Sequence, residues 1–231
     1  MEGCPVSSVE NGRIIVAIDG PSGSGKSSVS KAVARTLNAA YLDTGAMYRA
    51  ITFSVLAEGA DLNDAAAVAQ AVRDAQLEIS VDPDAELVQI AGQDVTQAIR
   101  EPRISENVSA VATNLEARAE LVRRQQEIIA ANERIVAEGR DITTVVAPDA
   151  DARILLTASE EARLRRRGLQ LGGTQNDAQL EAQVLARDAK DSTVVNFTEA
   201  ADGVMTVDSS DLDFEQTIAA VLDAVQAAKK N

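Results

Sequence analysis

The sequence predicts an α/β protein with a doubly wound, five-stranded parallel sheet and helices on both faces. Three observations predict it. Five short apolar runs alternate with helical patterns along the chain, and a glycine-rich phosphate-binding pattern follows the first run. In addition, 231 residues of which 45% are hydrophobic are enough for one substantial core, with no shift in composition that divides the chain.

The first predicted strand, residues 13–19, leads directly into the pattern G-x-x-x-x-G-K-[ST], and a helix is predicted over 26–37. The pattern and the residue after it comprise Gly20, Pro21, Ser22, Gly23, Ser24, Gly25, Lys26, Ser27 and Ser28. Backbone N–H groups of such a loop cradle phosphates, and the helix adds the positive end of its dipole. Lys26 is expected to reach the terminal phosphates and Ser27 to ligate Mg²⁺. This order predicts the P-loop NTPase fold with a nucleoside triphosphate, rather than a glycine-rich turn without chemistry.

The second strand, residues 39–42, ends in the segment Asp43-Thr44-Gly45. A helix over 46–58 and an alanine-rich helix ending near residue 75 are predicted next, with a break at 61–63. The new helix start can accept an anion, and Arg49 can make a bidentate phosphate contact. From this segment alone, an ordinary helix cap with a solvent-facing arginine remains an alternative.

A change of period marks residues 77–99, where apolar residues alternate and indicate a small antiparallel insertion. Helical patterning returns over 101–131 with an interruption near Asn114. A buried strand over 134–137 then ends in the charged segment Glu138-Gly139-Arg140-Asp141. Since ligands gather at the carboxyl ends of parallel strands, this segment belongs to the expected site, although its arginine and aspartate could instead form a structural salt bridge.

The last third of the chain combines two strands, 153–158 and 204–208, with basic helices and a final helix over 214–229. Ser159 is placed as the N-cap of the first basic helix. Its arginines at 163, 166 and 167 share one face, and residues 187, 190 and 191 repeat that spacing after the polar segment 172–177. Two basic helices flanking an exposed excursion resemble a lid, although solvated helix faces show the same pattern.

Composition limits the partners. A net charge of −14 argues against broad binding of nucleic acid, so any phosphate site must be local. Cys4 is the only cysteine and histidine is absent, which excludes an internal disulfide and makes a zinc site unexpected. No apolar stretch is long enough for a membrane span, and we expect a cytoplasmic protein. Without histidine, a reaction whose nucleophile is already an anion suits the chain best.

Four motifs together resemble those of the bacterial cytidylate kinase family: residues 20–28, 43–49, 138–141 and 187–193. The resemblance runs from about residue 14 to the end, and the insertion over 77–99 resembles that family's enlarged monophosphate-binding region. It implies phosphorylation of CMP and dCMP by ATP with Mg²⁺, in a monomer that binds neither nucleic acid nor membranes. The single kinase domain would then have a core (about 13–45, 115–160 and 200–231), a monophosphate-binding region (about 46–114) and a lid (about 161–199).

The resemblance also implies roles for single residues. Lys26, Arg140 and Arg187 would be catalytic; Arg49 and Arg140 would hold the acceptor phosphate, and Arg187 with Asp191 would lie near the ribose and the transferring group. Ser109 and Arg118 match the cytosine-reading positions, and Asp141 would accept from the exocyclic amine while repelling the carbonyl of uracil. Further expected site residues are Thr44 and Tyr48 for the acceptor, Arg166 for ATP, and Glu138 for Mg²⁺ through water.

Two positions depart from the family pattern. Thr143 stands where the family has glycine, which is expected to add a side chain beside the acceptor site, and Val194 stands where the family has an arginine. The competing functions are another small-molecule P-loop kinase, acting on uridylate, thymidylate or shikimate, and a nucleotide-binding switch that hydrolyses slowly. Asp141 with Arg118 argues against the first, and phosphorylation of a monophosphate would exclude the second.

Overall fold

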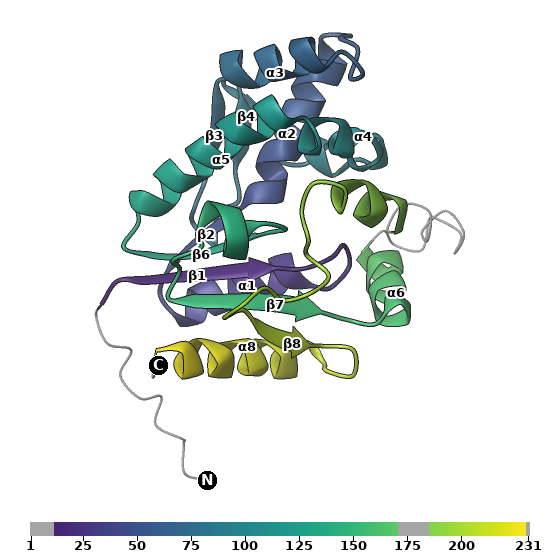
Figure 1. The fold of residues 1–231 in the computed structure, drawn as a ribbon. Coiled ribbons are helices and arrows are strands. Elements are labelled where there is room, and N and C mark those ends of the chain that lie inside the picture. Colours follow the sequence, from purple (N-terminus) through teal and green to yellow (C-terminus); the bar gives the residue numbers. More distant parts are fainter. Residues whose placement is uncertain (1–11, 171–184, 230–231) are drawn as a thin grey trace.

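A five-stranded parallel sheet forms the centre of the molecule (Figure 1). The computed structural model describes residues 12–170 and 185–229. The strands lie in the order β2-β6-β1-β7-β8, and every neighbouring pair is parallel. Their bounds are β1 Ile14–Asp19, β2 Ala40–Asp43, β6 Arg134–Gly139, β7 Ala152–Thr157 and β8 Met205–Asp208. The predicted fold class is confirmed.

Each face of the sheet carries its own apolar core. Along β1, Ile15 and Ala17 pack into one core while Ile14, Val16 and Ile18 pack into the other, as the alternation of side chains across a strand requires. The helices α2 (Thr44–Ala57) and α5 (Leu115–Ala130) supply residues to the first core; α1 (Lys26–Thr36) and α8 (Phe214–Ala228) supply residues to the second. The sheet is therefore doubly wound, and its central strands are largely apolar because both faces are covered.

The predicted insertion is a three-stranded antiparallel sheet, which lies with α3 and α4 at the top of Figure 1. Its elements are α3 Ala65–Asp74, β3 Leu77–Ile79, β4 Val88–Ile90, β5 Gln93–Asp94, the 3₁₀ turn η1 Ala98–Arg100 and α4 Pro102–Ala112. A small third core joins this sheet to α2 through Ala50, Val88 and Ile99. The alternation over 77–99 predicted the sheet, but β5 is too short for its own pattern to appear.

Polar caps set the ends of several helices. Asp43 accepts a hydrogen bond from the Ala46 backbone N–H at 2.8 Å, so α2 begins at Thr44, two residues before the predicted start. Asn114 caps α5 in the same way, which explains the interruption between the two helices there. Ser159 accepts from the Ala162 N–H at 3.3 Å and starts α6 (Glu160–Gln170), as predicted.

One local feature has no counterpart in the sequence prediction. A π-helical turn, η2 (Ile142–Val146), follows β6 directly, and β6 itself continues to Gly139, two residues beyond the predicted end. Five residues are too few to show a helical period. The predicted excursion over 172–177 lies outside the described residues, and residues 185–191 are helical. Within 12–170 and 185–229, no helix has the length and apolarity needed to cross a membrane.

Candidate active site

A cavity of about 920 Å³ opens at the carboxyl ends of the strands. This is the edge of a parallel sheet at which ligands are expected to bind. Its lining brings together seventeen of the predicted site residues: Ser22, Gly23, Ser24, Gly25, Lys26, Ser27, Ser28, Thr44, Tyr48, Arg49, Arg118, Glu138, Arg140, Asp141, Arg166, Arg187 and Asp191. Gly20, Pro21 and Ser109 lie outside the lining. Gly20 and Pro21 begin the loop, and Ser109 reaches the cavity through Asp191.

The loop after β1 has the backbone form of an anion cradle. Gly25 has a φ of 88° and is the N-cap of α1, with no side chain that could occupy the N–H groups of the first turn. A Cβ atom at Gly20 would lie 2.3 Å from the Leu156 carbonyl oxygen, so only glycine fits between the loop and β7. Lys26 donates to the Pro21 carbonyl at 3.3 Å, which folds its side chain back over the loop. Burial lowers the pKa of Lys26, and Glu138 opposes that shift.

Ser27 and Glu138 form a hydroxyl–carboxylate pair beside the loop. The Ser27 hydroxyl donates to Glu138 Oε1 at 2.5 Å, and the Tyr41 hydroxyl lies 3.4 Å from the same oxygen. Burial raises the pKa of Glu138 to about 7, and the neighbouring charge of Asp43 adds to that shift. Oxygen donors of this kind suit Mg²⁺, which is commonly bound by one or two protein groups together with phosphates and water. Among the described residues, no group of three or more Asp, Glu, Cys or His side chains is arranged to hold a metal ion by itself.

The start of α2 holds Arg49 in place. Its Nη2 atom lies 2.8 Å from Asp43 Oδ2, and both side chains are largely buried. Burial acts to raise the pKa of Asp43, but Arg49 and the Ala46 N–H outweigh it and the pKa is lowered. The Thr44 hydroxyl donates to the Glu138 carbonyl at 2.8 Å and ties the ends of β2 and β6 together. Arg49 is therefore a fixed cation in the cavity wall, and the alternative of a solvent-facing arginine is wrong.

Arg140 is surrounded by groups from three parts of the chain. Its Nη2 donates to Ser22 Oγ at 2.6 Å, and its guanidinium lies 2.8 Å from an oxygen of Asp188 and 2.8 Å from an oxygen of Asp191. The same guanidinium stacks 4.4 Å from the centre of the Phe197 ring. Arg140 therefore pairs with Asp188 and Asp191, from a later part of the chain, and not with its neighbour Asp141.

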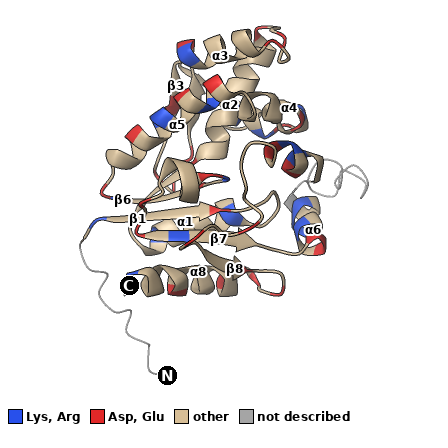
Figure 2. Ribbon diagram, viewed as in Figure 1, with Lys and Arg blue, Asp and Glu red and all other residues tan. Residues whose placement is uncertain are grey.

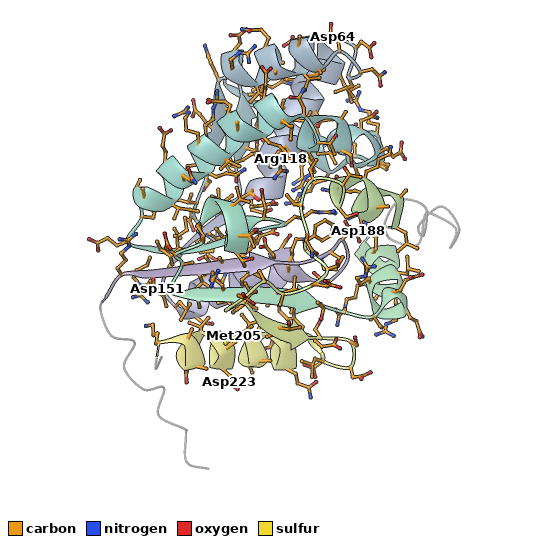
Figure 3. All side chains as sticks on the ribbon, viewed as in Figure 1. Asp64, Arg118, Asp151, Asp188, Met205 and Asp223 are labelled. Carbon is orange, nitrogen blue, oxygen red and sulfur yellow. The ribbon has the colours of Figure 1, made fainter. Side chains whose placement is uncertain are left out.

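Asp188 is a site residue that the sequence analysis missed. It accepts from the Ser22 backbone N–H at 3.2 Å and pairs with Arg163 at 2.5 Å, so it links residues 185–191 to the loop and to α6 (Figure 3). Phe197 was missed as well. For Asp188 the sequence held one signal: its i, i+3 spacing from Asp191 places both carboxylates on one face of the helix.

Positive charge is crowded on one wall of the cavity. Burial, together with Arg140 and Arg49, lowers the pKa of Arg187 to about 9. Its Nε lies 3.6 Å from Asp191, the nearest counter-charge. Three guanidinium groups held this close together favour an anionic ligand, above all one with several oxygens.

A second ion pair lies at another part of the cavity. Arg118 donates to Asp141 and, through Nη1, to the Ala112 carbonyl at 3.0 Å; Figure 3 shows Arg118 between the upper helices and the sheet. Burial raises the pKa of Asp141, and Arg118 opposes the shift. Nearby, the buried Ser109 hydroxyl donates to Asp191 at 2.8 Å. A buried acceptor beside a buried donor can distinguish the polar edges of a planar ligand.

The basic face of α6 packs on the phosphate-binding loop. Arg166 donates to the Ser24 carbonyl at 3.1 Å, to the Ser209 carbonyl at 2.6 Å and to the Leu212 carbonyl at 3.3 Å. Arg163 reaches the Ser22 carbonyl at 3.0 Å. In Figure 2 the basic residues of α6 lie at the same end of the sheet as the start of α1. The spacing predicted one face, and that face is directed at the loop.

The two departures from the expected pattern lie outside the cavity wall. Thr143 was expected beside the acceptor site, but it is buried behind it, where its hydroxyl donates to Asp19 at 2.6 Å. The threonine that stands in place of the expected glycine therefore adds a hydrogen bond and leaves the cavity unobstructed. Val194 follows the helical residues 185–191 and is only partly buried, while its neighbour Val195 lines the cavity.

Comparison with known proteins supplies independent information. The family model described as cytidylate kinase matches residues 16–227. A cytidylate kinase of Cutibacterium acnes is 48% identical over 216 residues, covering 92% of this chain and 96% of that protein. One from Nocardia farcinica is 48% identical over 214 residues, covering 90% and 92%. Among solved structures, a gluconokinase from Sinorhizobium meliloti matches with a TM-score of 0.54 at 15% identity over 95% of each chain, which supports the fold alone.

Proposed function

The chain belongs to the cytidylate kinase family, and we propose that its cavity transfers the γ-phosphoryl group of ATP directly to the phosphate of CMP or dCMP. The chain is thus a (d)CMP kinase that forms CDP and dCDP. The observation that carries the proposal is that the expected donor and acceptor residues line one continuous cavity. A triphosphate loop forms one part of it, a buried Arg118–Asp141 pair forms another, and a cluster of arginines shares the same lining.

The donor half consists of the loop and α6. The N–H groups at the start of α1 and the ammonium of Lys26 would hold the phosphates of ATP. Ser27, with Glu138 acting through water, would hold Mg²⁺, which when bound neutralises charge on the phosphates. Arg166 would flank the donor, since it already joins the loop at Ser24 to the loop after β8.

The acceptor half consists of the arginine wall. Arg49 and Arg140 would bind the acceptor phosphate, and Arg187 would stabilise the charge that spreads over the moving phosphoryl group. Asp188 and Asp191 keep Arg140 oriented before a ligand arrives. An acceptor phosphate oxygen is already ionised near neutral pH, so the transfer needs no general base. This agrees with a chain that has no histidine.

The base would be read by the second ion pair. Asp141 can accept a hydrogen bond from the exocyclic amine of cytosine, and Arg118 can donate to a neighbouring ring acceptor. Uracil presents a carbonyl where cytosine has the amine, so it would face a buried carboxylate and be disfavoured. Tyr48 and Ser109 would complete the acceptor site, because Tyr48 lines the cavity and Ser109 fixes Asp191.

The division into regions extends this proposal. Residues 46–114 would bind the monophosphate, residues 161–199 would act as the lid, and the remaining segments would form the core. Closing over the substrates would exclude water and suppress hydrolysis of ATP. We propose that the chain acts as a monomer.

A coupled assay of ADP release tests the function. The purified protein is given ATP and Mg²⁺ with CMP, dCMP, UMP, dTMP, AMP or shikimate, one at a time. We expect CMP and dCMP to have the highest kcat/KM. A better acceptor among the others would point to a different small-molecule kinase, and ATP binding without any phosphorylated product would point to a switch module.

A further inference from the structure

Asp19 is a buried carboxylate that the proposed mechanism does not use. It is the last residue of β1, immediately before the phosphate-binding loop, and its exposed fraction is only 2%. Three donors converge on it from a segment more than 120 positions away. The Ile142 N–H lies 2.9 Å from Oδ1, and the N–H and hydroxyl of Thr143 lie 2.8 and 2.6 Å from Oδ2.

These donors are the first two residues of the π-helical turn η2, and Asp141 directly precedes them. The Asp141 carbonyl accepts from the Val145 and Val146 N–H groups at 2.8 and 3.1 Å, so the turn closes back onto Asp141. Asp19 of β1 therefore caps η2, because its carboxylate accepts from the N–H groups at the start of the turn. The backbone of Asp141 is therefore fixed in two ways: its own carbonyl is bonded within the turn, and the two residues that follow it are bonded to Asp19.

We propose that Asp19 and Thr143 are positioning residues that fix the Asp141 carboxylate for base recognition, and through it determine discrimination between cytosine and uracil. The inference rests on the proposed function, in which Asp141 reads the base. Neither residue lines the cavity, so both act through the backbone of η2. The Asp19 carboxylate also joins the start of the donor loop to the acceptor site, since Asp19 is followed directly by Gly20.

The Thr143 hydroxyl strengthens this link. Burial raises the pKa of Asp19 to about 6, and the hydrogen bonds from Thr143 oppose that shift by stabilising the charged carboxylate. The Thr143 carbonyl in turn accepts from Arg153 of β7 at 3.3 Å. The Thr143 side chain therefore adds a hydrogen bond to β1, whereas the contact with β7 is made by its backbone carbonyl and would also be open to a glycine.

A set of substitutions separates positioning from a merely structural role. Thr143→Val keeps the shape but loses the donor, and Thr143→Ser keeps the donor. Thr96→Val is the matched control, because the Thr96 hydroxyl is also buried and accepts from the Val88 N–H at 2.9 Å in the antiparallel sheet. For each variant, kcat/KM is measured with CMP and with UMP, and the unfolding midpoint is measured in urea.

We expect Thr143→Val to lower the CMP to UMP ratio of kcat/KM by about 3- to 10-fold, chiefly through CMP, because Asp141 is no longer aligned with the amine. Thr143→Ser should restore the wild-type ratio, and Thr96→Val should lower the unfolding midpoint and leave the ratio unchanged. Asp19→Asn, which places an N–H against a backbone N–H, should lower the ratio further.

An unchanged ratio in Thr143→Val, with a loss of stability like that of Thr96→Val, would overturn the inference and leave the proposed function intact. A wild-type protein that does not prefer CMP to UMP would overturn the proposed function, and this inference with it.

Discussion

Lys26 is the residue on which phosphoryl transfer should depend most directly. Its ammonium is folded over the loop against the Pro21 carbonyl, where it would meet the terminal phosphates. Lys26→Ala should lower kcat by about 100- to 1000-fold, because one fixed positive group at the transferring phosphoryl is lost. The unfolding midpoint should change little, since the side chain makes one long hydrogen bond. Steady-state kinetics and urea unfolding check both statements.

Lys229→Ala is the matched control for that experiment. Lys229 is exposed at the end of α8 and does not line the cavity. Its removal should leave kcat nearly unchanged. A Lys26 variant with the turnover of the Lys229 variant would contradict the role of Lys26.

Asp141 should control the choice of base. Asp141→Asn keeps the size of the side chain but can offer an N–H to the carbonyl of uracil. The CMP to UMP ratio of kcat/KM should fall by about 10-fold or more, through weaker use of CMP and better use of UMP. Competition assays with both acceptors measure the ratio. If the ratio is unchanged, base recognition lies elsewhere in the cavity.

At the residue scale, the sequence could predict the groups that belong to local motifs. Lys26 and Ser27 follow from one continuous pattern, and the structure places both in the cavity lining. Asp188 could not be found in this way, because its meaning depends on contacts with Ser22, 166 positions away. Asp19 is similar: an acidic residue at a strand end is common, and its donors are known only once η2 is folded against β1.

At the scale of elements, strands and caps were predictable for physical reasons. The central strands are covered on both faces, so they appear as continuous apolar runs. Helix starts were predicted to within two residues, because Asp43 and Ser159 are short polar side chains that can satisfy the first N–H groups. The turn η2 was not predictable, since its start is capped by a distant strand and not by a neighbouring side chain.

The packing of α3 on α5 gives a prediction about stability. Arg124 of α5 donates to the carbonyls of Val72 and Ala75, both at 2.9 Å, at the end of α3, where a helix leaves carbonyl groups unpaired. Arg124→Ala should lower the free energy of unfolding by about 1–3 kcal/mol, measured in urea. Arg123→Ala is the control, because Arg123 is exposed and pairs with glutamates of the same helix, so its loss should change the free energy of unfolding little. Equal losses would contradict the capping role.

At the scale of the whole molecule, ion pairs anchor the monophosphate-binding region to the core. Lys31 and Arg35 of α1 pair with Glu86 and Asp84 between β3 and β4, and Arg100 of η1 shares Glu86. Burial acts to raise the pKa of Glu86, but the Lys31 hydrogen bond and the charge of Arg100 outweigh it, so the pKa is lowered. These contacts hold the acceptor region against the helix that follows the donor loop.

The distribution of charge over the molecule predicts opposite effects of salt on stability and on substrate binding. The chain carries a net charge of −14, while many of its arginines and lysines line the cavity. Raising NaCl from about 50 to 500 mM shortens the Debye length from above 10 Å to a few ångströms. Repulsion among the acidic groups of the surface is then weakened, so the melting temperature should rise or stay level. Attraction between the cavity and phosphate is weakened as well, so KM for CMP should rise about 2- to 10-fold.

Thermal unfolding and kinetics in the same salt series test both effects, with KCl as a check against a specific ion. A KM that stays constant while the melting temperature rises would mean that the cavity arginines are fully neutralised by their own carboxylates, and would contradict a phosphate-binding wall.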